Sequence, residues 1–278
     1  MNEGRQRGFL DQVFASWGID GAPSLSIDFL DRLQEAYLRH VPFENVTKVI
    51  KAGRSSSPES AVRGPVEFWK DHLRWKSGGT CFAATAAYQF LLRYLGFSSK
   101  LLFCRLPAEN PQAHTALWVT LGGRDLLVDV GYALPLPVAL SRSAPVRRRT
   151  LYYDVETRPG TRGEFLVFTE DDRGVRFRYR FQLEAVGEDR YHAAWRETFR
   201  SDAPYMRRLA LGRFEEGTRF LYKDPNVVYA ITRRGEFDLP LGPDAAKDLA
   251  LRFGMPETLI RAAMETLGRV PQTGSRLG

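Results

Sequence analysis

The stretch SGGTCF at residues 77–82 stands at the start of an apolar run with helical spacing and places Cys81 in the first turn of the expected helix. Its two glycines allow a sharp turn and a close approach of the backbone. The run continues to Gly96, a residue type that commonly ends helices. Because the N–H groups and the dipole at the start of a helix favour a negative charge, the pattern indicates a reactive thiolate at Cys81.

His114 and Asp129 supply the two groups that an activated cysteine needs. His114 follows Cys81 by 33 residues, and Asp129 follows His114 by 15. The strand-like runs that begin at His114 and end near Asp129 are joined by a short glycine-bearing loop at residues 122–124, which predicts a hairpin. Antiparallel pairing then brings both side chains to the same end of the sheet. A thiol, an imidazole and a carboxylate in this order predict a catalytic triad of Cys81, His114 and Asp129.

The pattern of hydrophobic residues changes twice along the chain. It is helical up to about residue 97, strand-like from about residue 100, and mixed in the last third. We expect helices over residues 9–17, 29–40, 66–73 and 81–96, and strands over residues 101–105, 114–121, 125–130, 150–155, 164–169, 175–183 and 191–195. The last third is expected to hold a strand over residues 227–232 and two short helices, which Pro243 and Pro256 open and Gly254 and Gly268 end.

The composition is that of a packed enzyme without a disulfide framework. The chain has 278 residues, of which 44% are hydrophobic, and this argues against disorder. Its two cysteines, Cys81 and Cys104, suit a reducing compartment, and we expect Cys104 to be a small buried hydrophobe. The first residues lack the apolar core of a signal peptide, and no apolar run approaches the length of a membrane span. We therefore expect a soluble, cytoplasmic protein.

The net charge of +7 raises the question of nucleic-acid binding. The basic clusters are small and far apart, however, and the arginines of residues 176–180 alternate with apolar residues, as on the outer face of a strand. We therefore expect surface arginines and no nucleic-acid partner. No metal site is expected either, because the remaining histidines show no metal-ligand spacing; these are His40, His72 and His192.

These motifs together resemble those of the arylamine N-acetyltransferases. That family carries Arg-Gly-Gly-x-Cys-Phe-Glu around its nucleophile, and residues 77–83 read Ser-Gly-Gly-Thr-Cys-Phe-Ala. Its histidine opens a strand, as His114 does, and its aspartate stands in Asp-Val-Gly-Phe-Gly, which is similar to Asp-Val-Gly-Tyr-Ala at residues 129–133. Its early Pro-Phe-Glu-Asn segment is present at residues 42–45. The resembling segments run from about residue 40 to 140 in the family's order.

The resemblance implies an α+β fold with a cysteine-protease-like arrangement of the triad. A helical bundle over residues 1–97 would carry the cysteine, and a β-barrel over residues 98–200 would carry the histidine and the aspartate. A mixed α/β lid over residues 201–278, with a loose tail after Arg269, would close over the cleft between them.

The resemblance also implies the reaction. An acetyl or other short acyl group would pass from acetyl-coenzyme A to a thioester on Cys81, and from there to an aromatic amine or a hydrazine, in a ping-pong mechanism without a metal. Tyr132 would lie in the acceptor pocket, where an aromatic ring can stack on a flat amine. Gly131 would be a contact of coenzyme A. The tetrahedral intermediate would need backbone N–H donors, for which the start of the cysteine's helix is the candidate.

Several positions depart from the family pattern. Ser77, Ala83 and Thr85 replace its arginine, glutamate and asparagine, so the surroundings of the nucleophile are less polar, and Ala133 replaces its second glycine. Other functions therefore stay open. The same triad serves an amide synthase that takes an acyl chain from a carrier protein, and it serves hydrolytic or transglutaminase-like enzymes. A non-catalytic acyl-coenzyme A-binding protein is a further alternative. We expect Glu44 and Asn45 to be structural and to brace the cysteine region through hydrogen bonds.

Overall fold

The N-terminal part of the chain is helical. In the computed structural model, which describes residues 3–20, 23–107, 114–224 and 226–268, six helices precede the first long strand. They are α1 (Glu3–Trp17), α2 (Ile27–His40), α3 (Val46–Arg54), α4 (Pro58–Ala61), α5 (Pro65–Trp75) and α6 (Cys81–Tyr94). The four helices expected in this part of the chain are α1, α2, α5 and α6, and the prediction of each is confirmed. Helix α3 was not predicted.

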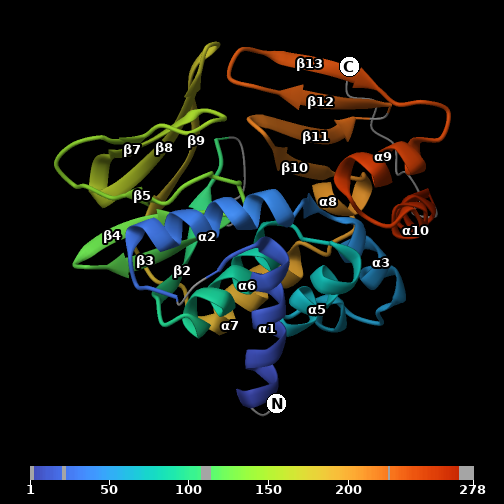
Figure 1. The fold of residues 1–278 in the computed structure, drawn as a ribbon, viewed down its shortest axis with the longest axis horizontal. Coiled ribbons are helices and arrows are strands. Elements are labelled where there is room, and N and C mark those ends of the chain that lie inside the picture. Colours follow the sequence, from blue (N-terminus) through green and yellow to red (C-terminus); the bar gives the residue numbers. More distant parts are fainter. Residues whose placement is uncertain (1–2, 21–22, 108–113, 225, 269–278) are drawn as a thin grey trace.

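The central part is an antiparallel sheet of eight strands in the order β5-β4-β3-β2-β9-β8-β7-β6. Its edge strands β5 and β6 lie close together, so the sheet nearly closes into a barrel, seen on the left of Figure 1. The strands are β2 (Ser98–Arg105), β3 (His114–Leu121), β4 (Arg124–Val128), β5 (Val138–Ala139), β6 (Val146–Arg148), β7 (Asp154–Pro159), β8 (Glu164–Asp171) and β9 (Gly174–Gln182). The short 3-10 helix η1 (Thr161–Gly163) precedes β8. The expected α+β fold with a central barrel is thus confirmed.

The hairpin of β3 and β4 decides where the candidate triad lies. Gly122 and Gly123 form a two-residue turn with φ values of 55° and 74°, which glycine adopts without strain. Strand β4 ends at Val128, two residues before the expected end of the strand over residues 125–130. Asp129 therefore lies just beyond the strand, in the turn beside the start of β3.

The C-terminal part holds a five-stranded sheet in the order β1-β10-β11-β12-β13. Its strands are β1 (Phe43–Glu44), β10 (Leu211–Glu215), β11 (Thr218–Asp224), β12 (Val227–Ile231) and β13 (Glu236–Pro240). Helices α7 (Glu188–Glu197) and α8 (Pro204–Arg207) precede β10, and α9 (Ala245–Phe253) and α10 (Glu257–Gly268) follow β13. The edge strand β1 comes from the Pro-Phe-Glu-Asn segment, and its Phe43 also forms a bridge to Gly79. The C-terminal sheet therefore reaches the loop that precedes Cys81.

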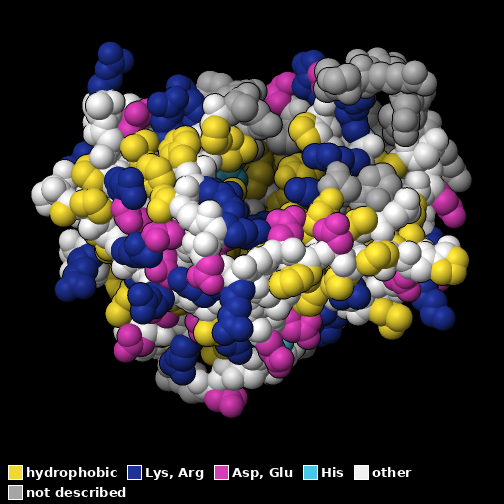
Figure 2. All heavy atoms as spheres, turned by 90° about the horizontal axis from the view of Figure 1, so that it is seen from above, with side chains coloured by type: hydrophobic (Ala, Val, Ile, Leu, Met, Phe, Trp, Pro, Cys, Tyr) yellow, Lys and Arg dark blue, Asp and Glu magenta, His cyan; other side chains and the backbone are white. Residues whose placement is uncertain are grey.

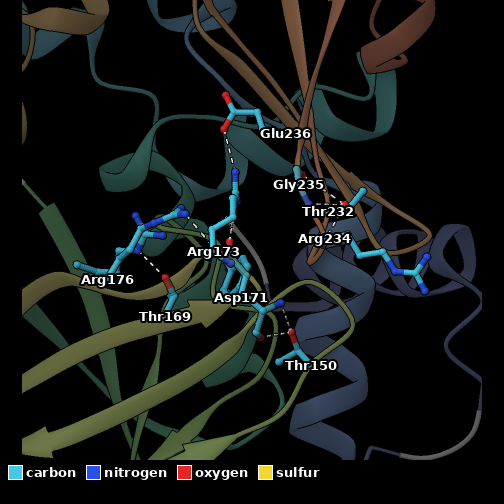
Figure 3. A network of polar contacts seen from close by, with 11 residues as sticks. Thr150, Thr169, Asp171, Arg173, Arg176, Thr232, Arg234, Gly235 and Glu236 are labelled. Atoms are coloured by element: carbon cyan, nitrogen blue, oxygen red, sulfur yellow. Dashed lines mark hydrogen bonds and ion pairs between the residues drawn. The ribbon is translucent and has the colours of Figure 1, made fainter.

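Two hairpin tips join the barrel to the C-terminal sheet. The Arg173 guanidinium at the β8–β9 tip pairs with Glu236 at 3.2 Å (Figure 3). The Asp172 N–H donates to the Arg233 carbonyl at 3.1 Å. Arg233 in turn binds the buried carboxylate of Asp154 at 2.6 Å. These contacts fix the two sheets relative to each other at the rim above the helices.

The strand predicted over residues 191–195 is wrong, because this segment is helix α7. Tyr191 and Trp195 are four residues apart and lie buried on one face of that helix. Gly187 is the N-cap, and acidic residues in the first turn favour a helix start. Periodicity over five residues cannot separate the two structures. The strand predicted over residues 150–155 is displaced, since β7 begins only at Asp154.

Two hydrophobic cores stabilise the molecule. The larger joins the N-terminal helices to the inside of the barrel and includes Cys81 and Cys104, and the smaller lies between α3, the C-terminal sheet and α9–α10. Among the described residues, no helix has the length and apolar character that crossing a membrane requires. The tail after Arg269 lies outside the described residues, and the domain limits at residues 97 and 200 stay predictions.

Candidate active site

The loop that carries Cys81 is held tightly against the Pro-Phe-Glu-Asn segment. Cys81 is the first residue of α6, with Thr80 as N-cap. A Cβ atom at Gly78 would lie 1.7 Å from the Pro42 carbonyl oxygen, so only glycine fits there. The Gly79 carbonyl accepts a hydrogen bond from the Glu44 N–H at 3.3 Å. The loop therefore brings Cys81 to a defined place, with 8% of the residue exposed.

Cys81, His114 and Asp129 lie in a continuous chain of contacts. His114 opens β3, and its Nε2 lies 2.7 Å from Oδ2 of Asp129. The imidazole also forms a hydrogen bond with the side chain of Cys81. Because Nε2 faces Asp129, Nδ1 is the ring nitrogen left for this bond. Asp129 is fully buried, and His114 is 4% exposed. The structure thus brings together the three residues that the sequence predicted to act as a triad.

Asp129 is fixed by three further contacts. Its Oδ1 accepts from the Tyr132 N–H at 2.7 Å, its Oδ2 accepts from the Tyr179 hydroxyl at 2.5 Å, and its carbonyl accepts from the Leu134 N–H at 2.8 Å. Tyr179 lies on β9 with its ring centroid 5.1 Å from that of His114. A role for Tyr179 was not predicted from the sequence. Its only sequence signal is the alternation along β9, which places it inside the barrel.

The carboxylate determines the charge of the imidazole. Burial alone lowers the pKa of His114, but the charge of Asp129 and the hydrogen bonds to Asp129 and Cys81 outweigh burial and raise this pKa to about 10. The imidazole is therefore positively charged at neutral pH.

Gly131 and Tyr132 both lie beside the candidate triad. A Cβ atom at Gly131 would lie 2.9 Å from Cα and Cβ of Cys81 and 3.3 Å from Cε1 of His114, so glycine lets the turn pack against both residues. The Tyr132 ring centroid lies 5.9 Å from that of His114, and the Arg178 guanidinium lies 6.0 Å from the Tyr132 ring centre. Seen from above, the molecule is hollowed between hydrophobic and cationic side chains, and a histidine is visible in the hollow (Figure 2).

Ala133 has the backbone conformation that favours glycine. Its φ is 68°, which costs a residue with a Cβ about 1 kcal/mol. The Ala133 carbonyl accepts a hydrogen bond from the Tyr153 hydroxyl at 2.7 Å, and the residue is 5% exposed. The turn therefore keeps the conformation that the family's second glycine suits, although a methyl group now occupies the place.

A buried lysine near Cys81 was missed by the sequence analysis. Burial lowers the pKa of Lys48 to about 8, and the charge of Cys81 partly opposes this shift. Its Nζ donates to the Thr198 carbonyl at 2.7 Å and to the Thr198 hydroxyl at 2.8 Å. No motif marks Lys48, because its burial depends on the packing of α3 against the segment after α7.

The remaining candidates have structural positions. His72 donates from Nδ1 to the Ser77 carbonyl at 2.8 Å, and its Nε2 accepts from Trp17 at 3.2 Å, so the ring is neutral; burial lowers its pKa to about 4. Glu44 braces the cysteine loop as expected. The Asn45 side chain instead ties down the segment before β10, through the Tyr205 and Arg208 carbonyls. Among the described residues, no group of three or more potential ligands is arranged to hold a metal ion.

Comparison with known proteins identifies the family. The model of a family described as N-acetyltransferase matches residues 26–224. An uncharacterized acetyltransferase of Bacillus subtilis is 26% identical over 63% of this chain and 69% of its own length. The arylamine N-acetyltransferase of Escherichia coli is 27% identical over 69% of this chain, and the alignment spans 61% of that protein, which is less than two thirds of it.

Solved structures share the fold. The arylamine N-acetyltransferase of Mycobacterium abscessus superposes with a TM-score of 0.80 and 22% identity over 94% of this chain and 95% of its own. The Mycobacterium marinum enzyme in complex with CoA has a TM-score of 0.78 and 17% identity over 92% and 98% of the two chains. Because the family model covers more than half of the sequence, the chain belongs to the arylamine N-acetyltransferase family of enzymes.

Proposed function

We propose that the protein transfers an acetyl group from acetyl-coenzyme A to an aromatic amine or hydrazine through a thioester on Cys81. The observation that carries this proposal is the buried hydrogen-bonded chain from Cys81 through His114 to Asp129. It is supported by the name of the Escherichia coli relative and by the coenzyme A complex of the Mycobacterium marinum enzyme, which shares the fold. In this proposal Cys81 is the nucleophile, His114 moves the proton, and Asp129 orients the imidazole.

In the first half-reaction the sulfur of Cys81 attacks the carbonyl carbon of the acetyl group. The new carbon–sulfur bond forms, the bond to the sulfur of coenzyme A breaks, and the imidazolium of His114 gives its proton to the departing sulfur. The negative oxygen of the intermediate needs donors, and the first N–H groups of α6 lack partners within the helix. The oxygen would lie at this positive end of the helix dipole.

In the second half-reaction the amine attacks the thioester carbon. The neutral imidazole of His114 removes a proton from the attacking nitrogen, the amide bond forms, and the sulfur of Cys81 leaves as the thiolate. The charged imidazole and the thiolate are thereby restored. Splitting one displacement into two easier ones is the advantage of the covalent intermediate.

Gly131 and Tyr132 are assigned to substrate contacts in this proposal. Gly131 packs directly against Cys81, because a Cβ atom there would lie 2.9 Å from Cα and Cβ of that residue, so its backbone is placed to contact acetyl-coenzyme A at the thiol. The Tyr132 ring beside His114 offers a face on which a flat amine can stack.

Steady-state kinetics test the proposal. Without an acceptor, purified protein should release about one equivalent of free coenzyme A from acetyl-coenzyme A. It should release coenzyme A repeatedly only when an arylamine or hydrazine is present. Double-reciprocal plots at several acceptor concentrations should be parallel, as for a ping-pong enzyme. Intersecting plots would contradict the covalent mechanism. Turnover only with an acyl carrier protein as donor would favour the amide synthase, and stoichiometric binding of acetyl-coenzyme A without turnover would favour a binding protein.

A further inference from the structure

A single buried arginine from outside the cysteine loop lies against that loop. Arg63, in the segment between α4 and α5, is 6% exposed. Its Nη2 donates a hydrogen bond to the Gly78 carbonyl and lies 3.1 Å from the position that a Cβ atom of Gly79 would take. The guanidinium therefore occupies the space beside both glycines and holds the peptide group three residues before Cys81.

Two acidic side chains and a ring fix the guanidinium in this place. Its Nη1 lies 3.3 Å from Oδ2 of Asp71, its Nη2 lies 3.8 Å from Oε1 of the fully buried Glu44, and its centre lies 4.8 Å from the Phe68 ring centre. Glu44 also accepts hydrogen bonds from the backbone and hydroxyl of Thr47. The Arg63 side chain thus links β1, α5 and the cysteine loop. A planar guanidinium suits this role because its N–H donors point in several fixed directions.

The same loop lacks the charged residues of the family motif. Ser77 stands where the motif has arginine, and Ala83 where it has glutamate. Ser77 is fully buried, and within the described part of the chain its hydroxyl has no hydrogen-bond partner. The position of the motif arginine therefore holds a small side chain without a hydrogen-bond partner among the described residues. The guanidinium of Arg63, from a neighbouring segment, binds the adjacent Gly78 carbonyl.

We propose that Arg63 is the positioning residue of the nucleophile in this protein and supplies from another segment the guanidinium that the family motif places at position 77. This inference rests on the acyl-transfer function proposed above. Arg63 holds the Gly78 peptide, and the Gly78–Thr80 backbone sets the direction in which α6 and its first residue begin. It does not touch the reacting atoms. A displacement of about 1 Å at a reacting centre can lower a rate about 10²-fold, so the fixed loop matters for the rate of acyl transfer.

The test compares Arg63→Met with the matched variant Lys51→Met. Lys51 also bridges to this region, since its Nζ donates to the Val62 carbonyl at 2.8 Å and to Glu67 at 2.6 Å, and it has no contact with the cysteine loop among the described residues. We expect Arg63→Met to lower the single-turnover rate of Cys81 acetylation about 10²-fold while the KM for acetyl-coenzyme A changes less than about threefold. Lys51→Met should leave both within about twofold.

Two double variants separate positioning from folding. Glu44→Gln/Arg63→Met removes the carboxylate that Arg63→Met leaves buried without a cationic partner, so the melting temperature of the double variant should recover toward the wild-type value. Acetylation should stay slow in it, because the Gly78 carbonyl still lacks its donor. Ser77→Arg/Arg63→Met returns the guanidinium to the motif position and should regain at least about tenfold in rate.

The outcomes that overturn the inference are distinct. The first is an acetylation rate of Arg63→Met within about threefold of wild type. The second is an acetylation rate of Glu44→Gln/Arg63→Met that recovers together with its stability. The third is a folded Ser77→Arg/Arg63→Met that acetylates no faster than Arg63→Met. Alkylation of Cys81 by iodoacetamide is measured on every variant and should fall in parallel with acetylation. Because this reaction needs no acetyl-coenzyme A, a wild-type protein that does not become acetylated would end the proposed function while the role of Arg63 is still measured.

Discussion

The two cysteines of the chain lie close to the same histidine, yet the backbone around them differs. Cys104 lies directly opposite His114 in the register of β2 and β3, and Cys81 approaches the same imidazole from the start of α6. Both are buried, at 0% and 8% exposure. Proximity to the imidazole therefore does not by itself select a nucleophile.

The difference lies in the backbone around each sulfur. Cys104 is in the interior of a barrel strand, where burial first and the charge of Asp129 second raise the pKa of its thiol well above the usual value. Cys81 stands at a helix N-terminus and forms a hydrogen bond with the imidazole, and the turn at Gly131 packs closely against it. In the proposed reaction, the glycine turn and the helix start are therefore what distinguish Cys81, as the nucleophile, from Cys104.

The largest expected effect separates the two cysteines directly. Cys81→Ala should lower acetyl transfer by at least about 10⁴-fold, because the covalent route is lost. Cys104→Ala should keep turnover within about threefold of wild type and lower the free energy of unfolding by about 1 kcal/mol, through a small cavity in the barrel. Steady-state kinetics and urea unfolding of both variants check this. A comparable loss of turnover in Cys104→Ala would break the comparison.

Removal of the carboxylate that binds the imidazole is expected to have the second largest effect on the acylation rate. Asp129→Asn should lower the acylation rate about 10³-fold with the fold intact, because the amide neither stabilises the charged imidazole nor fixes its tautomer. Tyr179→Phe removes only one hydrogen bond to Asp129 and should lower the rate about tenfold. Single-turnover acetylation and circular dichroism measure the two effects. An unchanged rate in Asp129→Asn would remove Asp129 from the triad.

The local part of this arrangement could be predicted from the sequence. Gly78 and Gly79 before an apolar helix predicted the place of Cys81, and the glycine turn at residues 122–123 predicted the meeting of His114 and Asp129. Both depend on backbone preferences over a few residues. The same approach failed for α7, where Tyr191 and Trp195 fit a strand and a helix equally over so short a segment.

The groups that support the candidate triad could not be predicted, because they come from distant segments. Tyr179 reaches Asp129 across 50 residues of sequence through the register of the barrel. Arg63 reaches Gly78 only because α5 folds back onto the cysteine loop. Lys48 is buried by the segment after α7. None of the three lies in a motif, and long-range packing alone decides their neighbours.

A methyl group in the turn beside Cys81 should disturb one cysteine and spare the other. Gly131→Ala should lower acylation about 10²-fold, since its Cβ would lie 2.9 Å from Cα and Cβ of Cys81 and displace the thiol from the imidazole. Gly187→Ala is the matched control, because a Cβ there would meet nothing within 4 Å. Iodoacetamide labelling followed by peptide mapping should show slower labelling of Cys81 only. Equal rates in the two variants would contradict the close contact.

The charge of the imidazole between the two cysteines predicts a dependence of stability on pH. The pKa of His114 is raised from 6.5 to about 10, so the stability that its charged form contributes is fully present below about pH 6.5 and is lost as the pH rises toward 10. The difference in unfolding free energy between wild type and His114→Gln should therefore shrink by at least about 1 kcal/mol from pH 6 to pH 9.5. Urea unfolding at both pH values measures it, and a difference that grows with pH would contradict the assignment.

The smallest effect concerns the strained alanine of the same turn. Ala133→Gly relieves a left-handed conformation worth about 1 kcal/mol, but glycine also gains freedom in the unfolded chain, so the net stabilisation should be below about 1 kcal/mol. Acylation of Cys81 should stay within about threefold of wild type. Thermal unfolding checks the first expectation. A clear destabilisation would mean that the methyl group contributes packing that exceeds the strain.

Direct detection of an acetyl group on Cys81 is the decisive test of the proposed thioester. Protein incubated with acetyl-coenzyme A in the absence of an acceptor is analysed by intact-mass measurement and peptide mapping. We expect the added mass of one acetyl group on the peptide that contains Cys81 and none on the peptide that contains Cys104. The added mass should disappear when an arylamine is added. An acetyl group on another residue, or release of coenzyme A that persists in Cys81→Ala, would contradict it.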